Sequence, residues 1–563
     1  MKKYHLLYIA STLFLAGLTS CEDTLTEEPD SSYKKEQFFT SESKAEMAIY
    51  GIYHSIEHSD HYGSVETVTP ASDDTYYMNG TNIDNIRRDI AHYVLTPSNA
   101  WIQNIWIYKY QGIDRANYAI DGIQSMPGYE ENKALQALVA EARFLRAFLA
   151  FDLVKYWGDV PFKTTYTSDY ASTFQGRTSR EIIYDEIIKD LDFAKNNLSW
   201  ADASSSPERA TQGAARALLM RVYLQRAGYS LQQDGNLTRP DDAKRKEYFG
   251  AVIKEWEAFE ANKYHDFYPN GFDGLFKDVS AGIINSKENL FEIAFYFTPD
   301  GTQGKGVWGT YNGPEVVAPV IKPTETANFM GRANAFFRVV PEWKDFFENS
   351  DVRRDVMVCT YMYKWDTQSY NHKKVENKSN RWYPGKWRRE WMPIGYKNPN
   401  STDVNYCPLR YADVVLMAAE AYNETGDTPM AWTLLNKVRT RAKATEITPS
   451  NYTSLVKAPQ VYNLPFISDA DDAGKFRTAL YWERAFELAF EGQRKYDLIR
   501  WGILKEALEL FGSKSAVNKP INANDSYPAY KNFVTGKHEL FPIPLKEIQS
   551  NPKLEGKNNP GYN

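Results

Sequence analysis

Apolar residues recur every three or four positions in several long stretches of the chain, a spacing that predicts amphipathic helices. The clearest pattern covers residues 134–157, and the turn-forming run 158–161 ends it. A hydroxyl and a carboxylate spaced as a capping box open a second helix at Thr178. A third helix, over residues 214–227, stops at Gly228.

The second half of the chain repeats this pattern. Residues 410–425 predict a helix that ends at Gly426, and Thr428 caps a following helix that Pro429 opens. Two antiparallel helices within about 34 residues have the size of a tetratricopeptide unit. Another helix is expected over residues 476–490. We therefore predict an all-α superhelix of tetratricopeptide-type helix pairs.

Two long segments interrupt the helical patterns, from about residue 53 to 100 and from about 298 to 403. Both are rich in Tyr, Trp, Asn and Gly. Loops of this length in a compact body are usually functional, so we expect the ligand contacts to lie there.

The first residues form a targeting signal. Lys2 and Lys3 precede an apolar run over residues 6–18, which is too short to span a bilayer and predicts a secretory signal over 1–20. The run ends in Leu-Thr-Ser-Cys, which resembles a bacterial lipobox and makes Cys21 the expected lipidation site. The alternative is an incidental cysteine after an ordinary cleavage site. Residues 21–35 then form an acidic tether, and no other stretch is apolar for 18 residues.

The mature body is expected to be a single domain over residues 36–563. Its helical-repeat half extends to about residue 290, and a loop-rich half covers about 291–563. Cys359 and Cys407 either pair in this exported setting or stay as buried thiols, and their spacing fits no metal site.

Composition narrows the function. The chain is 43% hydrophobic and 25% charged, as expected of a folded protein. Its net charge of −6 leaves no basic excess for a phosphate backbone, so nucleic acid is not an expected partner. Aromatic residues make up 15% of the chain, more than a core easily accommodates, so some rings should be exposed. Exposed rings suit sugars or a protein partner.

Several motifs, in order along nearly the whole mature chain, resemble one family, the SusD/RagB lipoproteins of Bacteroidetes. The similar stretches are residues 141–148 with 158–161, 209–214, 409–413 with 419–421 and 435–439, 483–501, 541–544 and 559–562.

This resemblance implies a helical fold with tetratricopeptide-like repeats, minor β-hairpins and an outer-membrane location. It further implies binding of oligosaccharide or polysaccharide at the cell surface, and a SusC-like TonB-dependent transporter that the lipoprotein covers as a lid. A minority of such proteins resemble peptide binders. The charged motif residues, such as Arg410 and Glu487, are expected to pair between packed helices rather than to contact ligand.

One short string suggests chemistry. His54, Glu57 and His58 match the H-x-x-E-H pattern, in which two histidines on one helix face hold zinc and the glutamate acts as base. The alternative is a solvated helix end leading into the first long loop. We favour the alternative, because a five-residue match arises easily by chance in a long chain.

A sugar site needs an aromatic face for the C–H side of the ring, with amide, carboxylate or guanidinium groups for the hydroxyls. Trp101 stands where a loop enters a helix, with Asn104 one turn further on, although Trp101 would equally fit a core with Trp106 and Tyr110. From the preceding loop region we add Asp60, Asp84 and Tyr77 as ligand-binding candidates, while noting that such acids often cap turns.

The second long loop supplies the remaining candidates. Trp308 is flanked by glycines and is expected to be exposed. Residues 381–391 are dense in rings and guanidinium groups, and from them we select Arg389 and Trp391. This segment would stack sugars, hold an anionic sugar or form internal cation–π pairs.

The chain carries no G-x-S-x-G, no phosphate loop and no defensible pair of catalytic carboxylates. The resemblance and the ring-rich loops together predict a surface glycan-binding lipoprotein. The absence of these motifs predicts that it has no catalytic residue, metal or cofactor. A peptide-binding lid is the alternative, and a surface glycan hydrolase is a further one.

Overall fold

The computed structural model describes residues 35–64, 72, 74–77, 84–296, 305–317, 328–393, 401–455, 470–514 and 528–563. The predicted signal and the lipidation site at Cys21 lie outside the described residues. No helix in the described ranges is long and apolar enough to cross a membrane.

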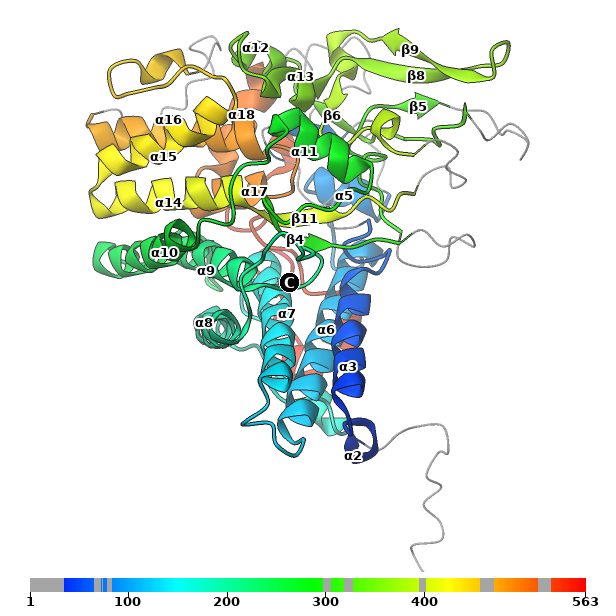
Figure 1. The fold of residues 1–563 in the computed structure, drawn as a ribbon, viewed down its shortest axis with the longest axis vertical. Coiled ribbons are helices and arrows are strands. Elements are labelled where there is room, and N and C mark those ends of the chain that lie inside the picture. Colours follow the sequence, from blue (N-terminus) through cyan, green and yellow to red (C-terminus); the bar gives the residue numbers. More distant parts are fainter. Residues whose placement is uncertain are drawn as a thin grey trace, which may run out of the picture.

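The body is a stack of antiparallel helices, as predicted. Its main members are α3 (Glu42–Ile56), α6 (Ala100–Gln124), α7 (Lys133–Trp157), α8 (Arg180–Asn197), α9 (Gln212–Ala227), α10 (Asp242–Asn262), α14 (Tyr411–Thr425), α15 (Thr428–Arg441) and α16 (Asp472–Leu488). Successive helices pack side by side, and α10 packs on α14 although about 150 residues of chain separate them. The stack therefore continues across the second long loop (Figure 1).

Local sequence signals set the helix ends, with small corrections. The hydroxyl of Ser179, not that of Thr178, accepts the hydrogen bond from the Glu181 amide that caps α8, because the backbone of Thr178 pairs with Val160. The Asp427 carboxylate caps α15 one residue before the predicted Thr428. Gly426 ends α14 as expected, in the left-handed conformation that glycine adopts without strain.

The second long loop is an insertion at one point of the stack. Strand β4 (Asn289–Ile293) pairs antiparallel with β11 (Tyr406–Arg410), so the chain leaves and returns at neighbouring positions. The insertion carries β5 (Val316–Val317), β6 (Phe337–Val339), α12 (Trp343–Phe346), α13 (Arg353–Met357), β7 (Val358–Cys359), β8 (Tyr361–Asp366), β9 (Asn371–Glu376) and β10 (Tyr383–Pro384). The β8–β9 hairpin projects at the upper right of Figure 1.

The first long loop meets this insertion through a two-stranded sheet. Strand β1 (Thr75–Tyr77) pairs antiparallel with β6, Tyr76 opposite Arg338. The short helix α5 (Arg87–Ala91) follows β1 and leads to α6. Two loops that lie far apart in the sequence are thus held together next to the start of α6.

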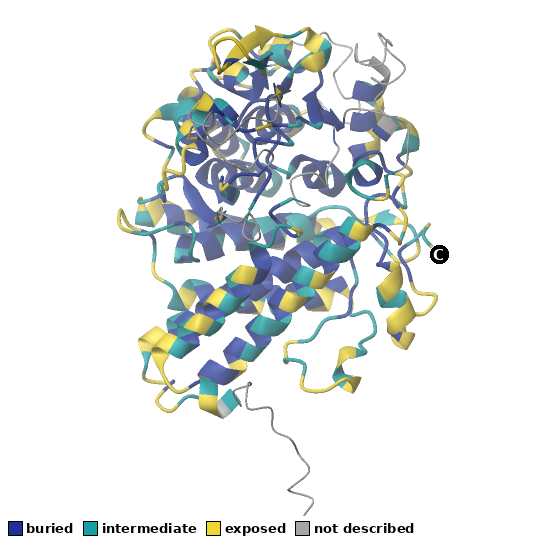
Figure 2. Ribbon diagram, turned by 90° about the vertical axis from the view of Figure 1, so that its right-hand side faces the viewer, coloured by how far each residue is buried: buried dark blue, intermediate teal, exposed yellow. Residues whose placement is uncertain are grey.

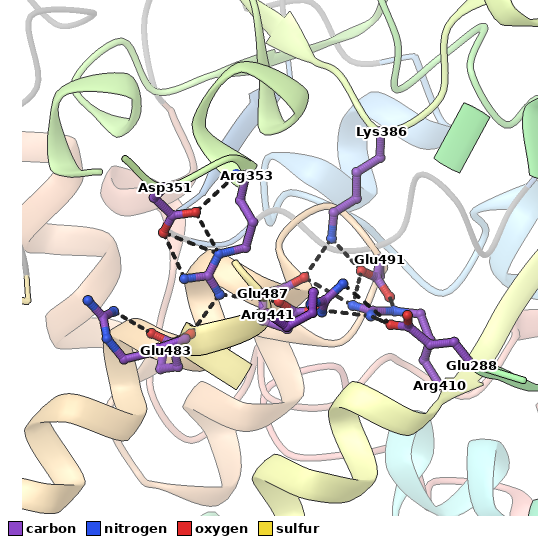
Figure 3. Close-up of polar contacts among 10 residues, drawn as sticks. Glu288, Asp351, Arg353, Lys386, Arg410, Arg441, Glu483, Glu487 and Glu491 are labelled. Atoms are coloured by element: carbon purple, nitrogen blue, oxygen red, sulfur yellow. Dashed lines mark hydrogen bonds and ion pairs between the residues drawn. The ribbon is translucent and has the colours of Figure 1, made fainter. Parts of the chain in front are cut away.

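A buried charge network ties the insertion to the repeats (Figure 3). Arg353 from α13 binds Glu483 at 2.6 Å and Glu487 at 3.2 Å on α16. Arg410, which precedes α14, binds Glu487 at 2.9 Å and Glu288 at 2.6 Å. These side chains are almost fully buried, so the expectation that the charged motif residues pair within the fold is confirmed.

The remaining α-helices and strands of the described ranges are all shorter than the stacked helices. They are α2 (Lys35–Phe38), β2 (Ser230–Leu231), β3 (Leu237–Thr238), α11 (Gly271–Ser280), α17 (Arg494–Arg500), α18 (Leu504–Lys514), α19 (Pro528–Asn532) and α20 (Leu545–Ser550). Near the chain end, the Asn559 amide donates to the Trp157 carbonyl, which fastens the C-terminal segment to α7. Figure 2 shows buried residues filling the centre, with exposed residues on loops and along stripes of the long helices.

Candidate ligand-binding surface

The start of α6 is set by Asn99. Its side-chain oxygen accepts hydrogen bonds from the backbone amides of Trp101 and Ile102, and its own amide donates to the Ile86 carbonyl at 2.9 Å. This cap satisfies amides that lack helical partners and joins α6 to the loop before it. Trp101 is thereby held half-buried in the first turn, at the edge of the two long loops.

A ring cluster forms around Arg87, the first residue of α5. The guanidinium carbon lies 4.1 Å from the ring centroid of Phe336, 5.4 Å from that of Tyr311 and 5.5 Å from that of Trp101. All three rings are half-buried and each comes from a different part of the chain. Contacts of a cation with ring faces are each worth about 0.5–2 kcal/mol, so Arg87 holds the rings together. We call these four residues the Arg87 ring cluster.

Tyr77 contacts two members of this cluster, Arg87 and Phe336. Arg87 Nε donates a 2.7 Å hydrogen bond to the Tyr77 hydroxyl, and the Tyr77 ring stacks against Phe336. Burial raises the pKa of Tyr77 to about 12. With only 2% of its surface exposed, Tyr77 orients Arg87 rather than offering a face to ligand, which corrects its predicted contact role.

Asp84 builds the start of α5. Its carboxylate accepts from the Ile86 and Arg88 amides, while the Asp89 carboxylate accepts from the Asp84 and Asn85 amides. This reciprocal arrangement fixes α5 and so the position of Arg87. Asp84 thus caps a turn, as loop aspartates often do. Its hydrogen bond to a sugar hydroxyl stays a prediction.

One face of α6 continues from the Arg87 ring cluster along the helix. Trp101, Asn104 and Tyr108 follow at spacings of three and four and so share a helix face. The Tyr108 ring stacks on His58 at 4.0 Å, and the Asp60 amide donates to His58 Nδ1 at 3.1 Å. Burial and the nearby charge of Asp60 both raise the pKa of Tyr108.

The α6 surface therefore consists of the Arg87 ring cluster, Asn104, Tyr108, His58 and Asp60. It brings together three predicted contact residues, Asp60, Trp101 and Asn104. Sequence reasoning missed Arg87, Tyr108, Tyr311 and Phe336. Tyr108 had a detectable signal, since it lies one helical turn after Asn104, whereas Tyr311 and Phe336 reach α6 only through the β1–β6 pairing.

Two predicted residues of the insertion lie in the interior instead. Trp308 is 1% exposed and stacks on Tyr406 at 4.6 Å, so the expectation of an exposed indole is wrong. Its glycine neighbour permits close packing: a side chain at Gly309 would lie 2.6 Å from Met392. Arg389 is also 1% exposed and donates to the backbone carbonyl oxygens of Arg332 and Ser401.

Trp391 is half-buried under Arg388, whose guanidinium carbon is 4.6 Å from the ring centroid. Arg388 itself donates to backbone oxygens of Gly385 and Asp355. At Arg388, Arg389 and Trp391 the segment therefore forms cation–π pairs within the fold, the third of the alternatives given for it. Its guanidinium groups donate to buried backbone oxygens rather than project outward.

The histidine motif does not assemble a metal site. Helix α3 ends at Ile56, so His54 and His58 do not share a helix face. His54 instead contacts Glu57 at 3.1 Å. Within the described ranges no group of three side chains is placed to hold a metal ion. Cys359 and Cys407 are both unpaired thiols, which settles the choice left open by their spacing.

The fold and the surface define a class: an all-α helical-repeat protein whose long loops converge on one helix. Residues 334–562 match the model described as "SusD family", and residues 23–224 match "Starch-binding associating with outer membrane". The SusD-like protein P2 of Formosa agariphila is 30% identical over 100% of both chains. The chain belongs to the SusD family.

Solved structures agree with this assignment. A SusD homolog from Bacteroides thetaiotaomicron is 26% identical, with a TM-score of 0.77 over 94% of this chain and 98% of that one. Surface glycan-binding protein A from Bacteroides thetaiotaomicron, in complex with laminarihexaose, has a TM-score of 0.64 and 19% identity, covering 92% and 99% of the two chains. At 19% identity, the similarity to this second structure shows a shared fold only.

Proposed function

We propose that this protein binds oligosaccharides at the cell surface and passes them to a SusC-like TonB-dependent transporter without breaking bonds. One observation carries the proposal: Arg87 holds the rings of Trp101, Tyr311 and Phe336 beside Asn104 on α6. The C–H face of a sugar ring packs on such rings. The Asn104 amide, which both donates and accepts hydrogen bonds, then reads adjacent hydroxyl groups.

Two likenesses support this ligand class. One matching family is described as starch-binding, and a related fold is described in complex with laminarihexaose. We infer an outer-membrane location and a lipid anchor from the lipobox that ends at Cys21. Replacing Cys21 by serine is expected to release the protein from the membrane fraction and to abolish palmitate labelling.

The ligand class is tested by calorimetry with five hexasaccharides, built from α-1,4-glucose, β-1,3-glucose, β-1,4-glucose, β-1,4-xylose and β-1,4-mannose. The unaltered protein is expected to bind at least one of them. Trp101→Ala is expected to weaken that binding about tenfold or more, the cost of losing a central tryptophan contact.

Trp200→Ala is the matched control, because Trp200 is also half-buried beneath an arginine, with Arg216 at 5.6 Å from its ring. Unchanged affinity in Trp101→Ala removes the α6 surface from the site. Peptides that co-purify and bind in place of every sugar favour the peptide-binding lid. Release of shortened sugars by the purified protein identifies a hydrolase.

A further inference from the structure

A ring-lined cavity of about 400 Å³ lies on the side of α6 that faces away from the α6 surface. Its walls come from α6, from residues 161–175 and from α20. The rings that line it include Tyr110, Phe162, Tyr170 and Phe174. Cavities of about 300–1,000 Å³ with mostly apolar walls are the usual size and character of small-ligand sites.

The walls of this cavity are held by the protein itself. The Tyr110 hydroxyl donates to the Pro161 carbonyl at 2.6 Å, and the Thr167 amide donates to the Asp114 carboxylate at 2.7 Å. The Asn551 amide donates to the Gln175 carbonyl at 2.9 Å, which joins the end of α20 to the opposite wall. The cavity is therefore formed before any ligand arrives, which lowers the entropic cost of binding.

Its rim leaves apolar surface in water. Tyr170 is 79% exposed, and its ring is supported edge-on by Phe174 at 4.9 Å. Ile107 on α6 is also exposed. A ring held outward by a second ring beside a preformed hollow is a surface that a bound partner of matching shape would cover.

Charge selects the kind of ligand. Asp114, Glu547 and Lys163 are the charged side chains of the described lining, which leaves one excess negative charge and disfavours anionic ligands. Glu547 lies close enough to Tyr110 that its charge, after burial, helps to raise the pKa of that hydroxyl. A carboxylate has about four acceptor positions, so both acids retain capacity for hydroxyl donors.

We propose that this cavity is a second carbohydrate site, which takes a neutral sugar residue of the same chain that the α6 surface binds. The inference rests on the proposed function. Trp101 and Tyr110 are nine residues apart on one helix, so they point in roughly opposite directions about 13 Å apart along its axis. One glycan that wraps α6 contacts both sites, and the two contacts reinforce one another by effective concentration.

The test uses calorimetry with the five hexasaccharides named above and three variants, Trp101→Ala, Phe174→Ala and the double variant. Tyr370→Ala, which removes an exposed tyrosine from the β8–β9 turn, is the matched control for a fourth variant, Tyr170→Ala. We expect the single variant Trp101→Ala to retain weak binding. Adding Phe174→Ala or Tyr170→Ala to it is expected to abolish that residual binding. Folding of each variant is checked by thermal unfolding.

The outcomes separate the two proposals. If the unaltered protein binds a hexasaccharide but Trp101→Ala binds none, the second site is excluded while the proposed function stands. If the residual binding of Trp101→Ala persists when Phe174→Ala or Tyr170→Ala is added, the second site is also overturned. If the unaltered protein binds no hexasaccharide, both proposals fail. Binding lost in Phe174→Ala yet intact in Trp101→Ala removes the α6 surface from the site, and so also overturns the proposal that one glycan contacts both sites.

Discussion

Arg87 lies over the ring of Phe336, with its guanidinium carbon 4.1 Å from the ring centroid. The two residues are brought together by the pairing of β1 with β6, which joins the first long loop to the insertion. Neither loop carries a complete site. The contact between them creates a supported patch of rings beside α6, so the tertiary pairing of loops, not either loop alone, forms the candidate site.

Replacing Arg87 by alanine is expected to weaken oligosaccharide binding by about 2- to 30-fold. The rings of Trp101, Tyr311 and Phe336 lose their shared cation, worth about 0.5–2 kcal/mol, and shift apart. Calorimetry measures the change. Arg239→Ala is the control, because Arg239 also lies over a ring, that of Tyr229, but outside the α6 surface. Equal losses in both variants contradict the role given to Arg87.

Glu487→Gln is expected to lower the free energy of unfolding by about 3–5 kcal/mol, because it removes the one buried negative charge that three arginines share. Glu487 is fully buried and binds Arg353, Arg410 and Arg441. Urea unfolding measures the loss. Glu376→Gln, at an exposed position on β9, is the control and is expected to change stability by less than about 0.5 kcal/mol.

The same carboxylate predicts a pH dependence. Burial alone would raise the pKa of Glu487, but the charges of Arg441, Arg410 and Arg353 outweigh it and hold the pKa at about 2. Its stabilisation is therefore present above the ordinary value of 4.5 and is lost as pH falls from 4.5 toward 2. Glu487→Gln is expected to lose less stability than the parent between pH 5 and pH 3. Parallel curves in that range would show that Glu487 does not titrate as proposed.

Lys495→Met is expected to stabilise the protein at pH 7 by about 2–4 kcal/mol. Lys495 is 2% exposed, between the rings of Tyr93 and Phe541. Burial lowers its pKa from 10.5 to about 7, with partial compensation from Glu539. Between pH 7 and 10.5 the unfolded chain holds the proton that the folded chain releases, so parent stability rises with pH.

Urea unfolding at pH 7 and pH 9 tests this prediction. The difference between the two pH values is expected to shrink in Lys495→Met and to stay in Lys531→Met, which alters an exposed lysine of α19. The same pH response in the parent and in Lys495→Met would contradict the assignment.

Reducing agent is expected to leave the thermal midpoint unchanged, because Cys359 and Cys407 form no disulfide. Burial raises the pKa of both thiols, so little reactive thiolate is present at neutral pH. In a chain that starts after Cys21, a thiol reagent is expected to react slowly with the native protein. Unfolding should then expose two thiols at once. A single fast-reacting thiol in the native state would contradict the low reactivity expected of Cys359, which is buried, and of Cys407, which is half-buried.

The residues of the helical stack could be predicted from the sequence because their signals are local. The apolar spacing of α7 and the glycines that end α9 and α14 depend only on residues a few helical turns away. The motif charges could be predicted because a buried charge needs an oppositely charged partner. The position of Trp101 and Asn104 at the start of a helix could be predicted from a local signal too, since a capped loop-to-helix junction is visible in the sequence.

The tertiary structure alone decided which rings are exposed and which loops meet. Trp308 and Trp101 look alike as loop tryptophans, yet one is enclosed by Tyr406 and Trp387 and the other stays half-open under Arg87. The difference depends on strand pairing between segments more than 250 residues apart. Burial is a property of all the neighbours a side chain acquires on folding, and a linear pattern contains only the nearest of them.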